Sequence, residues 1–179
     1  GVGRGEGAAG VGAGGVVWAG VAQLAKRRCE LWWVGTEGFA GVAAAMDALG
    51  VQLECARVGL VQEAQDRGVG DQSSSPSSAA WLMEHSFHLE PVDAARTVDL
   101  ARLCRLPANQ VMAAAVSGGT VTVRKAMTAL RQLRQVEHDL APGKREEALA
   151  SLTLMAQSGY DRHVVAIGRA LMALVGADR

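Results

Sequence analysis

Residues 81–126 read WLMEHSFHLEPVDAARTVDLARLCRLPANQVMAAAVSGGTVTVRKA, and three helix-start signals recur along them at short intervals. Pro91 and Pro107 suit the first position of a helix, because the N–H that proline lacks is unpaired there anyway. Thr122 belongs to the residue types that cap helix starts. The spacing predicts several short helices, as in the trihelical modules that place one helix in a DNA groove. Plain helical cores have the same pattern.

The flanking residues extend this helical pattern in both directions. Ser77 or Ser78 is suited to cap a helix over 79–85, and Gly118 and Gly119 are expected to end the helix that Pro107 begins. Asp161 is expected to cap the last helix. With the remaining segments at 91–105, 123–136 and 144–157, the sequence predicts an all-α fold with a multi-helix bundle and a helix-turn-helix-like core.

Upstream, apolar residues spaced 3, 4, 3, 4, 3 and 4 apart predict one long helix over 39–67. This heptad seam consists of Phe39, Val42, Met46, Leu49, Leu53, Ala56 and Leu60. Packing against the chain's own bundle is the favoured interpretation, because the seam is short for a coiled coil. The alternative is a homodimer through Phe39, Val42, Met46, Leu49, Leu53 and Leu60.

Composition divides the chain into five segments. Residues 1–15 form a Gly-rich arm expected to be disordered, and residues 16–38 have only a weak helical pattern. The heptad helix at 39–67 is followed by the Ser/Gly linker GVGDQSSSPSS at 68–78 and by the bundle at 79–179. A start at Gly1 rather than Met leads us to expect a fragment or a processed chain.

Charge and cysteine usage narrow the class of protein. The 18 Lys and Arg residues equal the 18 Asp and Glu residues, so no net field attracts nucleic acid or membrane. Cys29, Cys55 and Cys104 lie far apart without a paired motif, and we expect buried free thiols in a reducing cytoplasm. No run reaches about 18 apolar residues, so the sequence predicts no membrane span.

Motifs for catalysis, cofactors and metals are weak. Gly5, Gly7 and Gly10 form a GxGxxG, but neither a strand nor a βαβ unit surrounds it. His85 and His88 have no Cys or carboxylate ligands at metal-site spacing. We therefore expect no cofactor, no metal and no catalytic centre within these residues.

In its order of motifs, the chain resembles the family called domain of unknown function 222, or the 13E12 repeat family, of actinobacterial proteins. The resemblance covers residues 39–179 and rests on a long helix before a Ser-rich linker, an S-x-A-W-L arrangement, a Leu-Pro run, a G-x-L-S-x-x-H-A motif and a final Asp-capped helix. The residues that carry it are Ser78, Ala80, Trp81, Leu82, Leu89, Pro91, Leu100, Ala101, Arg102, Leu106, Pro107, Gly119, Val121, Thr122 and Ala126. Glu90, Thr122 and Lys125 depart from the family's Ser, Ser and His.

This resemblance implies an association with HNH endonucleases, since family members commonly continue into an HNH nuclease domain. By the resemblance that domain would begin where this sequence stops, at Arg179. The central segment is also similar to the helix-turn-helix of ParB partition proteins. That similarity implies a recognition helix over 91–105.

DNA binding needs Arg or Lys on an exposed face, because phosphate contacts supply most of the affinity. Arg96, Arg102 and Arg105 are candidates on the implied recognition helix, although Glu90, Asp93 and Asp99 accompany them. The second set of candidates is Arg124, Lys125, Arg131 and Arg134. Positions 124, 131 and 134 share a helix face that no acid interrupts before Glu137.

The sequence thus predicts a non-catalytic helical module of an HNH endonuclease-associated protein, with DNA as its partner and the cytoplasm as its location. Two alternatives stay open. One is a structural or oligomerisation module, and the other is a truncated remnant of a repeat-family protein that does not contact DNA.

Overall fold

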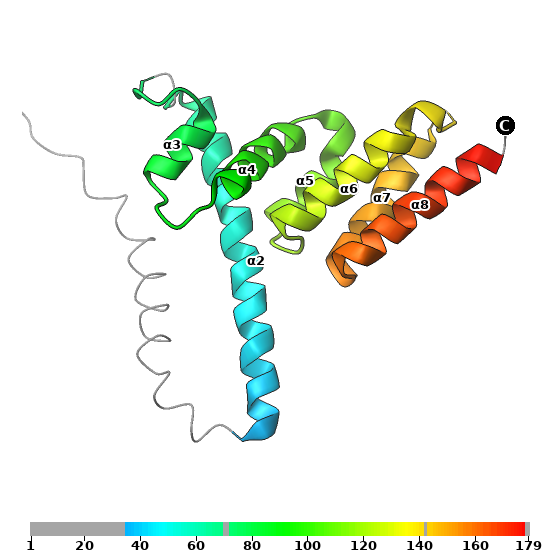
Figure 1. The fold of residues 1–179 in the computed structure, drawn as a ribbon, viewed down its shortest axis with the longest axis horizontal. Coiled ribbons are helices and arrows are strands. Elements are labelled where there is room, and N and C mark those ends of the chain that lie inside the picture. Colours follow the sequence, from blue (N-terminus) through cyan, green and yellow to red (C-terminus); the bar gives the residue numbers. More distant parts are fainter. Residues whose placement is uncertain (1–34, 70–71, 142, 178–179) are drawn as a thin grey trace, which may run out of the picture. The chain divides into compact units, whose positions relative to one another are not determined.

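The structure is a computed structural model that describes residues 35–69, 72–141 and 143–177. All regular elements within these ranges are helices, which confirms the predicted all-α class. Two compact units divide the chain at residues 45 and 46, and helix α2 (Thr36–Asp66) crosses this boundary (Figure 1). The predicted arm at 1–15 and most of the segment at 16–38 lie outside the described residues.

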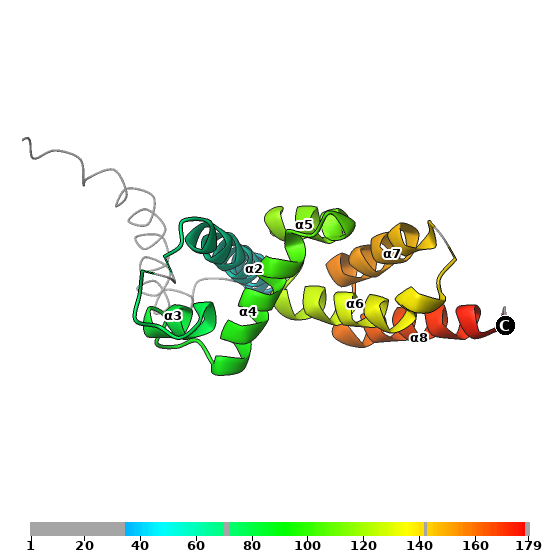
Figure 2. The same cartoon turned by 90° about the horizontal axis from the view of Figure 1, so that it is seen from above.

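The second unit contains the C-terminal part of α2 and a series of shorter helices. Helices α6, α7 and α8 pack against one another and lie side by side in both views (Figures 1 and 2). Helix α4 packs against α3, α5 and α6. In chain order the elements after α2 are α3 (Ser78–Glu84), α4 (Pro91–Cys104), the 3-10 turn η2 (Pro107–Asn109), α5 (Gln110–Ser117), α6 (Val123–Val136), the 3-10 turn η3 (Glu137–Asp139), α7 (Lys144–Ser158) and α8 (Asp161–Ala177).

The helix starts follow from local capping. Ser77 Oγ accepts a hydrogen bond from the Ala80 N–H at 3.1 Å, and Thr122 Oγ1 accepts one from the Lys125 N–H at 3.2 Å. Pro91 occupies the first turn of α4, with Asp93 beside it at the positive end of the helix dipole. These three predicted starts are confirmed. The predicted cap at Asp161 is wrong, because Asp161 is itself the first residue of α8 and its carboxylate pairs with Arg124.

The turn between α5 and α6 depends on one glycine. Gly119 has a φ of +65°, a left-handed conformation that residues with a Cβ rarely adopt. The Thr120 N–H then donates to the Ala115 carbonyl at 3.1 Å, which closes the end of α5 as a Schellman-type cap. A Cβ on Gly119 would also lie 3.1 Å from Gln52 Cγ of α2, so close packing and backbone conformation both favour glycine.

Helix α2 contacts the bundle through a face that the heptad pattern does not include. Cys55, Val58 and Val61 are buried, and the Cys55 thiol donates to the Val121 carbonyl at 3.2 Å. The heptad seam faces elsewhere: the exposed fractions are 48% for Phe39, 64% for Met46, 43% for Leu53 and 55% for Leu60. The favoured prediction that this seam packs against the chain's own bundle is therefore wrong.

The core of the second unit lies between α6 and its neighbours. Leu133, Leu149, Leu152 and Val164 are fully buried and bring α6, α7 and α8 together. Gly168 of α8 permits the closest approach, since a Cβ placed there would lie 2.8 Å from Gln132 Cβ of α6. The core thus holds α6 firmly while the opposite face of that helix stays exposed.

The segment Gly38–Asp66 of α2 has the length and apolar composition of a membrane span, and few of its side chains are buried. The sequence-based expectation that the chain has no membrane span and no membrane partner therefore stays a prediction. Asp47, Glu54 and Arg57 interrupt the segment, and its last turns pack into the bundle through Val58 and Val61. These contacts join the C-terminal part of α2 to the rest of the second unit.

Candidate nucleic-acid interface

The arginines of α4 are paired with acids on the same helix. Arg96 Nη1 lies 2.9 Å from Asp93 Oδ1, and Arg102 Nη2 lies 3.7 Å from Asp99 Oδ1. Each pair spans three residues and is exposed, so it contributes little to stability. It does, however, cancel the charge that a phosphate group would meet first.

Arg105, just beyond α4, ties α4 to α2. Its Nη1 lies 2.7 Å from Asp66 Oδ1, and its Nη2 donates to the Gln62 carbonyl at 2.6 Å. The third candidate of the implied recognition helix thus has a structural role. The helix that the ParB similarity singled out offers no basic side chain without an acidic partner among its three candidates.

Helix α6 carries the other four candidates. Arg124 Nε lies 2.9 Å from Asp161 Oδ2 of α8, an acid that no inspection of α6 alone reveals. Lys125, Arg131 and Arg134 form no ion pair with any residue that the structure describes. Arg131 and Arg134 are exposed, whereas Lys125 is half-buried. Of the seven predicted residues, these three keep an unpaired positive charge.

A groove between α4 and α6, of about 420 Å³, brings Arg131 and Arg134 together with Arg102. Its apolar floor includes Leu103, Met127 and Leu130. The full lining consists of Asp99, Arg102, Leu103, Leu106, Ala108, Asn109, Met127, Leu130, Arg131, Leu133, Arg134, Glu137 and Arg145. Four arginines against two carboxylates give this groove a local excess of positive charge in a molecule whose net charge is zero.

Arg145 of α7 completes the groove and was not among the sequence candidates. Its Nε contacts Glu137 Oε1 at 2.5 Å, its Nη2 donates to Asn109 Oδ1 at 3.0 Å, and its Nη1 donates to the Ala108 carbonyl. A signal for it exists in the sequence: a cation in the first turn of a helix opposes the helix dipole, so it needs a partner elsewhere. Because its guanidinium donors already bond to groups of the chain itself, we assign Arg145 a structural role in the groove wall and do not count it as a phosphate contact.

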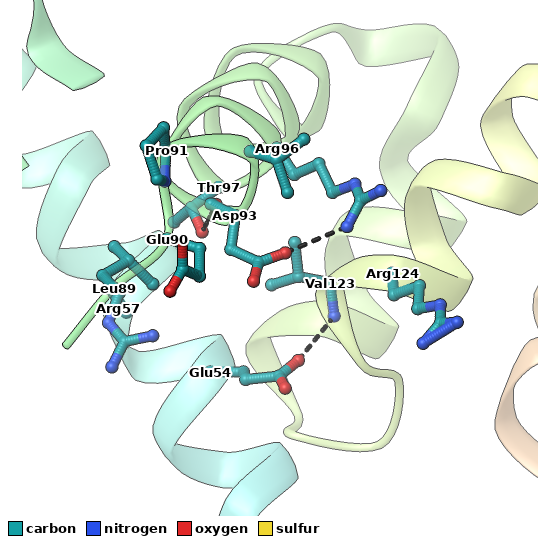
Figure 3. Close-up of a pocket in the computed structure, with 11 residues that line it drawn as sticks. Glu54, Arg57, Leu89, Glu90, Pro91, Asp93, Arg96, Thr97, Val123 and Arg124 are labelled. Atoms are coloured by element: carbon teal, nitrogen blue, oxygen red, sulfur yellow. Dashed lines mark hydrogen bonds and ion pairs between the residues drawn. The ribbon is translucent and has the colours of Figure 1, made fainter.

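Arg96 and Arg124 instead line a second depression, of about 560 Å³, where α2, α4 and α6 meet (Figure 3). Arg57 joins them there, and three carboxylates face them from Glu54, Glu90 and Asp93. Three cations against three anions leave no excess charge. Arg124 thus lines a different depression from Arg131 and Arg134, although all three lie on one helix face.

Two of the three cysteines are described, and both are buried free thiols, as predicted. Burial raises the pKa of Cys104 to about 11, with a smaller contribution from Cys55. The pKa of Cys55 is also raised, first by burial and then by Glu54. Cys29 lies outside the described residues. Within the part of the chain that the structure describes, no three His, Cys, Asp or Glu side chains lie close enough together to hold a metal ion.

Comparison of the chain with known protein families, with curated proteins and with solved structures gives no match. The groove and its charges are therefore the basis for a functional assignment.

Proposed function

We propose that this chain is a non-catalytic helical module that binds duplex DNA through α6, with Arg131 and Arg134 as its principal phosphate contacts. The observation that carries the proposal is the pair of exposed guanidinium groups, one helical turn apart, without acidic partners in the described ranges. Arginine forms bidentate hydrogen bonds with phosphate oxygens, so two such groups on one face suit a polyanionic backbone.

The surrounding groove supports the same partner. Arg102 adds a third cation from α4, while Asp99 and Glu137 reduce the excess charge. The affinity expected from so few contacts is modest and strongly dependent on salt. In motif order the chain is similar to the domain of unknown function 222 family, and an association with an HNH nuclease and a cytoplasmic location belong to the same proposal.

Salt titration of DNA binding tests the proposal. Fluorescence anisotropy of a labelled duplex, measured from about 50 to 200 mM salt, is expected to show affinity that falls steeply with salt. Changing Arg131 and Arg134 to Ala together is expected to reduce the slope of log K against log salt by about two, one for each lost phosphate contact.

Arg169→Ala provides a matched control, because Arg169 is exposed on α8 and does not line the groove. It removes the same charge and is expected to leave the slope unchanged. Absence of binding at the lowest salt, or equal losses in the groove and control variants, would contradict the proposal.

A further inference from the structure

The heptad seam of α2 is an apolar surface that no described residue of the second unit covers. Met46, Leu53 and Leu60 are exposed there, although the same helix buries Cys55, Val58 and Val61. These two sets lie on opposite sides of the helix at 100° per residue. The helix thus has one face for the bundle and a separate apolar face with the period of a coiled coil.

We propose that this seam pairs with the seam of a second copy of the chain in an antiparallel two-helix arrangement. The heptad positions determine the register, because the first and fourth positions of the heptad face each other in antiparallel pairs. Facing positions then add up to 102, so that Leu53 meets Leu49 of the other copy, Met46 meets Ala56, and Leu60 meets Val42. Every contact occurs twice because the pair has two-fold symmetry.

Charge complementarity favours this register. In this register, position 45 of one copy faces Arg57 of the other. Asp47 lies two residues from position 45, which is about 3 Å along the helix axis. Asp47 and Arg57 lie on the same edge of the pair, so two symmetric ion pairs form. A parallel pair in register brings Arg57 instead toward Gln52 of the other copy, which carries no charge.

Apart from Arg57 and Gln52, the positions beside the seam from 43 to 59 are Ala or Gly. Ala43, Ala45, Gly50 and Gly59 flank it, and a Cβ added to Gly50 or Gly59 would meet nothing within 4 Å. Glycine within a helix costs about 1 kcal/mol relative to alanine, and beyond the adjacent turns of α2 itself no residue that the structure describes lies within 4 Å of a Cβ at either position. A second helix that approaches closely does explain them, and Gly50 lies one residue from position 51, where this register places the two-fold axis.

This pairing is independent of DNA binding, and its experiment contains no DNA. Sedimentation equilibrium of the full chain over a range of concentrations is expected to show a reversible dimer of twice the 18.6 kDa monomer mass. Leu53→Lys is expected to raise the dimer dissociation constant on the order of a hundredfold, because each dimer loses two buried leucines. Ala44→Lys, an exposed position of the same helix outside the seam, is the matched control and is expected to dimerise as the unmodified chain does.

A charge exchange tests the register itself. Arg57→Glu is expected to weaken the dimer about fivefold, since it replaces an attraction by a repulsion in both symmetric ion pairs. Adding Asp47→Arg in the same chain restores the attraction with reversed signs and is expected to recover the original constant. A double variant that dimerises more weakly than Arg57→Glu alone overturns the antiparallel register.

Two further outcomes overturn the pairing as a whole. In the first outcome, the full chain is a monomer at every concentration tested but dimerises when residues 1–34 are removed. That result would mean that the chain covers its own seam. Alternatively, a monomeric chain sediments with vesicles of phosphatidylcholine and phosphatidylglycerol and loses this property on Leu53→Lys, in which case the seam binds lipid. Circular dichroism of each variant confirms that the helices form.

Discussion

The Glu54 carboxylate of α2 accepts a hydrogen bond from the backbone N–H of Val123, 3.0 Å away and 69 residues later in the chain. Val123 is the first residue of α6, where N–H groups have no partner within the helix. A carboxylate is the preferred group at such a helix start, because it meets both an unpaired donor and the positive end of the dipole. Glu54 therefore joins the long helix to the helix that carries the candidate interface.

Removing this contact is expected to destabilise the fold. Glu54→Ala should lower the free energy of unfolding by about 1–2 kcal/mol, and Glu54→Gln, which keeps an acceptor, by less. Urea unfolding followed by circular dichroism measures both. Glu63→Ala on the same helix is the control. Within the described ranges the Glu63 carboxylate pairs with Arg67 alone, on the exposed surface, so its loss should change stability by under about 0.5 kcal/mol. Equal effects at 54 and 63 would contradict this role.

Arg145 and Arg131 line the same groove but are expected to respond differently to truncation. Arg145→Ala removes the donors to Asn109 Oδ1 and to the Glu137 carboxylate, and should lower stability by about 2–3 kcal/mol. Arg131→Ala removes no ion pair and should stay within about 0.5 kcal/mol. Urea denaturation midpoints distinguish the two, and a neutral Arg145→Ala would show that its contacts do not hold the groove.

The α6–α8 contact is expected to be intolerant of a methyl group. Gly168→Ala would force its Cβ into the buried Gln132 side chain and should cost about 1–3 kcal/mol. Gln132 Oε1 has no hydrogen-bond partner within the described part of the chain, so shortening this side chain removes an uncompensated polar atom. The double variant Gln132→Ala/Gly168→Ala should therefore be more stable than the sum of the single effects by about 1 kcal/mol. An additive cycle would place the strain elsewhere.

Stability is expected to fall in alkaline solution because of Cys104. Its pKa rises from 9.0 to about 11 on folding, so the unfolded chain releases the thiol proton first. The contribution of this thiol to the free energy of unfolding is fully present below pH 9. It is lost as the pH rises toward 11, by an amount on the order of 2 kcal/mol. Unfolding measured across this range should fall less steeply for Cys104→Ala than for the unmodified chain. Parallel pH profiles would contradict the assignment.

Helix starts could be predicted because their causes lie within a few residues of the start. Ser77 and Thr122 cap helices whose first N–H groups are three positions away, and Pro91 determines its own φ. Asp161 was misjudged because its partner, Arg124, lies on another helix. A short polar side chain at a helix start is equally suited to cap its own helix or to pair across the fold, and only packing decides.

The buried face of α2 could not be predicted from apolar periodicity. Its most regular stripe contains large residues such as Met46 and Leu60, yet these are exposed, whereas Cys55, Val58 and Val61 enter the core. Small side chains suffice there because α2 approaches the bundle closely, as the contact between Gly119 and Gln52 indicates. The candidate site has the same limitation, since the acids that pair with Arg105 and Arg124 come from α2 and α8.

The two ion pairs along α4 have a consequence at longer range. Asp93 with Arg96 and Asp99 with Arg102 each form a short local dipole, whose field decays faster with distance than that of a single charge. At physiological salt, interactions between exposed charges more than about 8 Å apart are largely screened as well. An anion that diffuses toward this side of the molecule is thus attracted only weakly by α4. In the proposed DNA complex, Arg131 and Arg134 of α6 are therefore expected to determine the orientation of the first encounter.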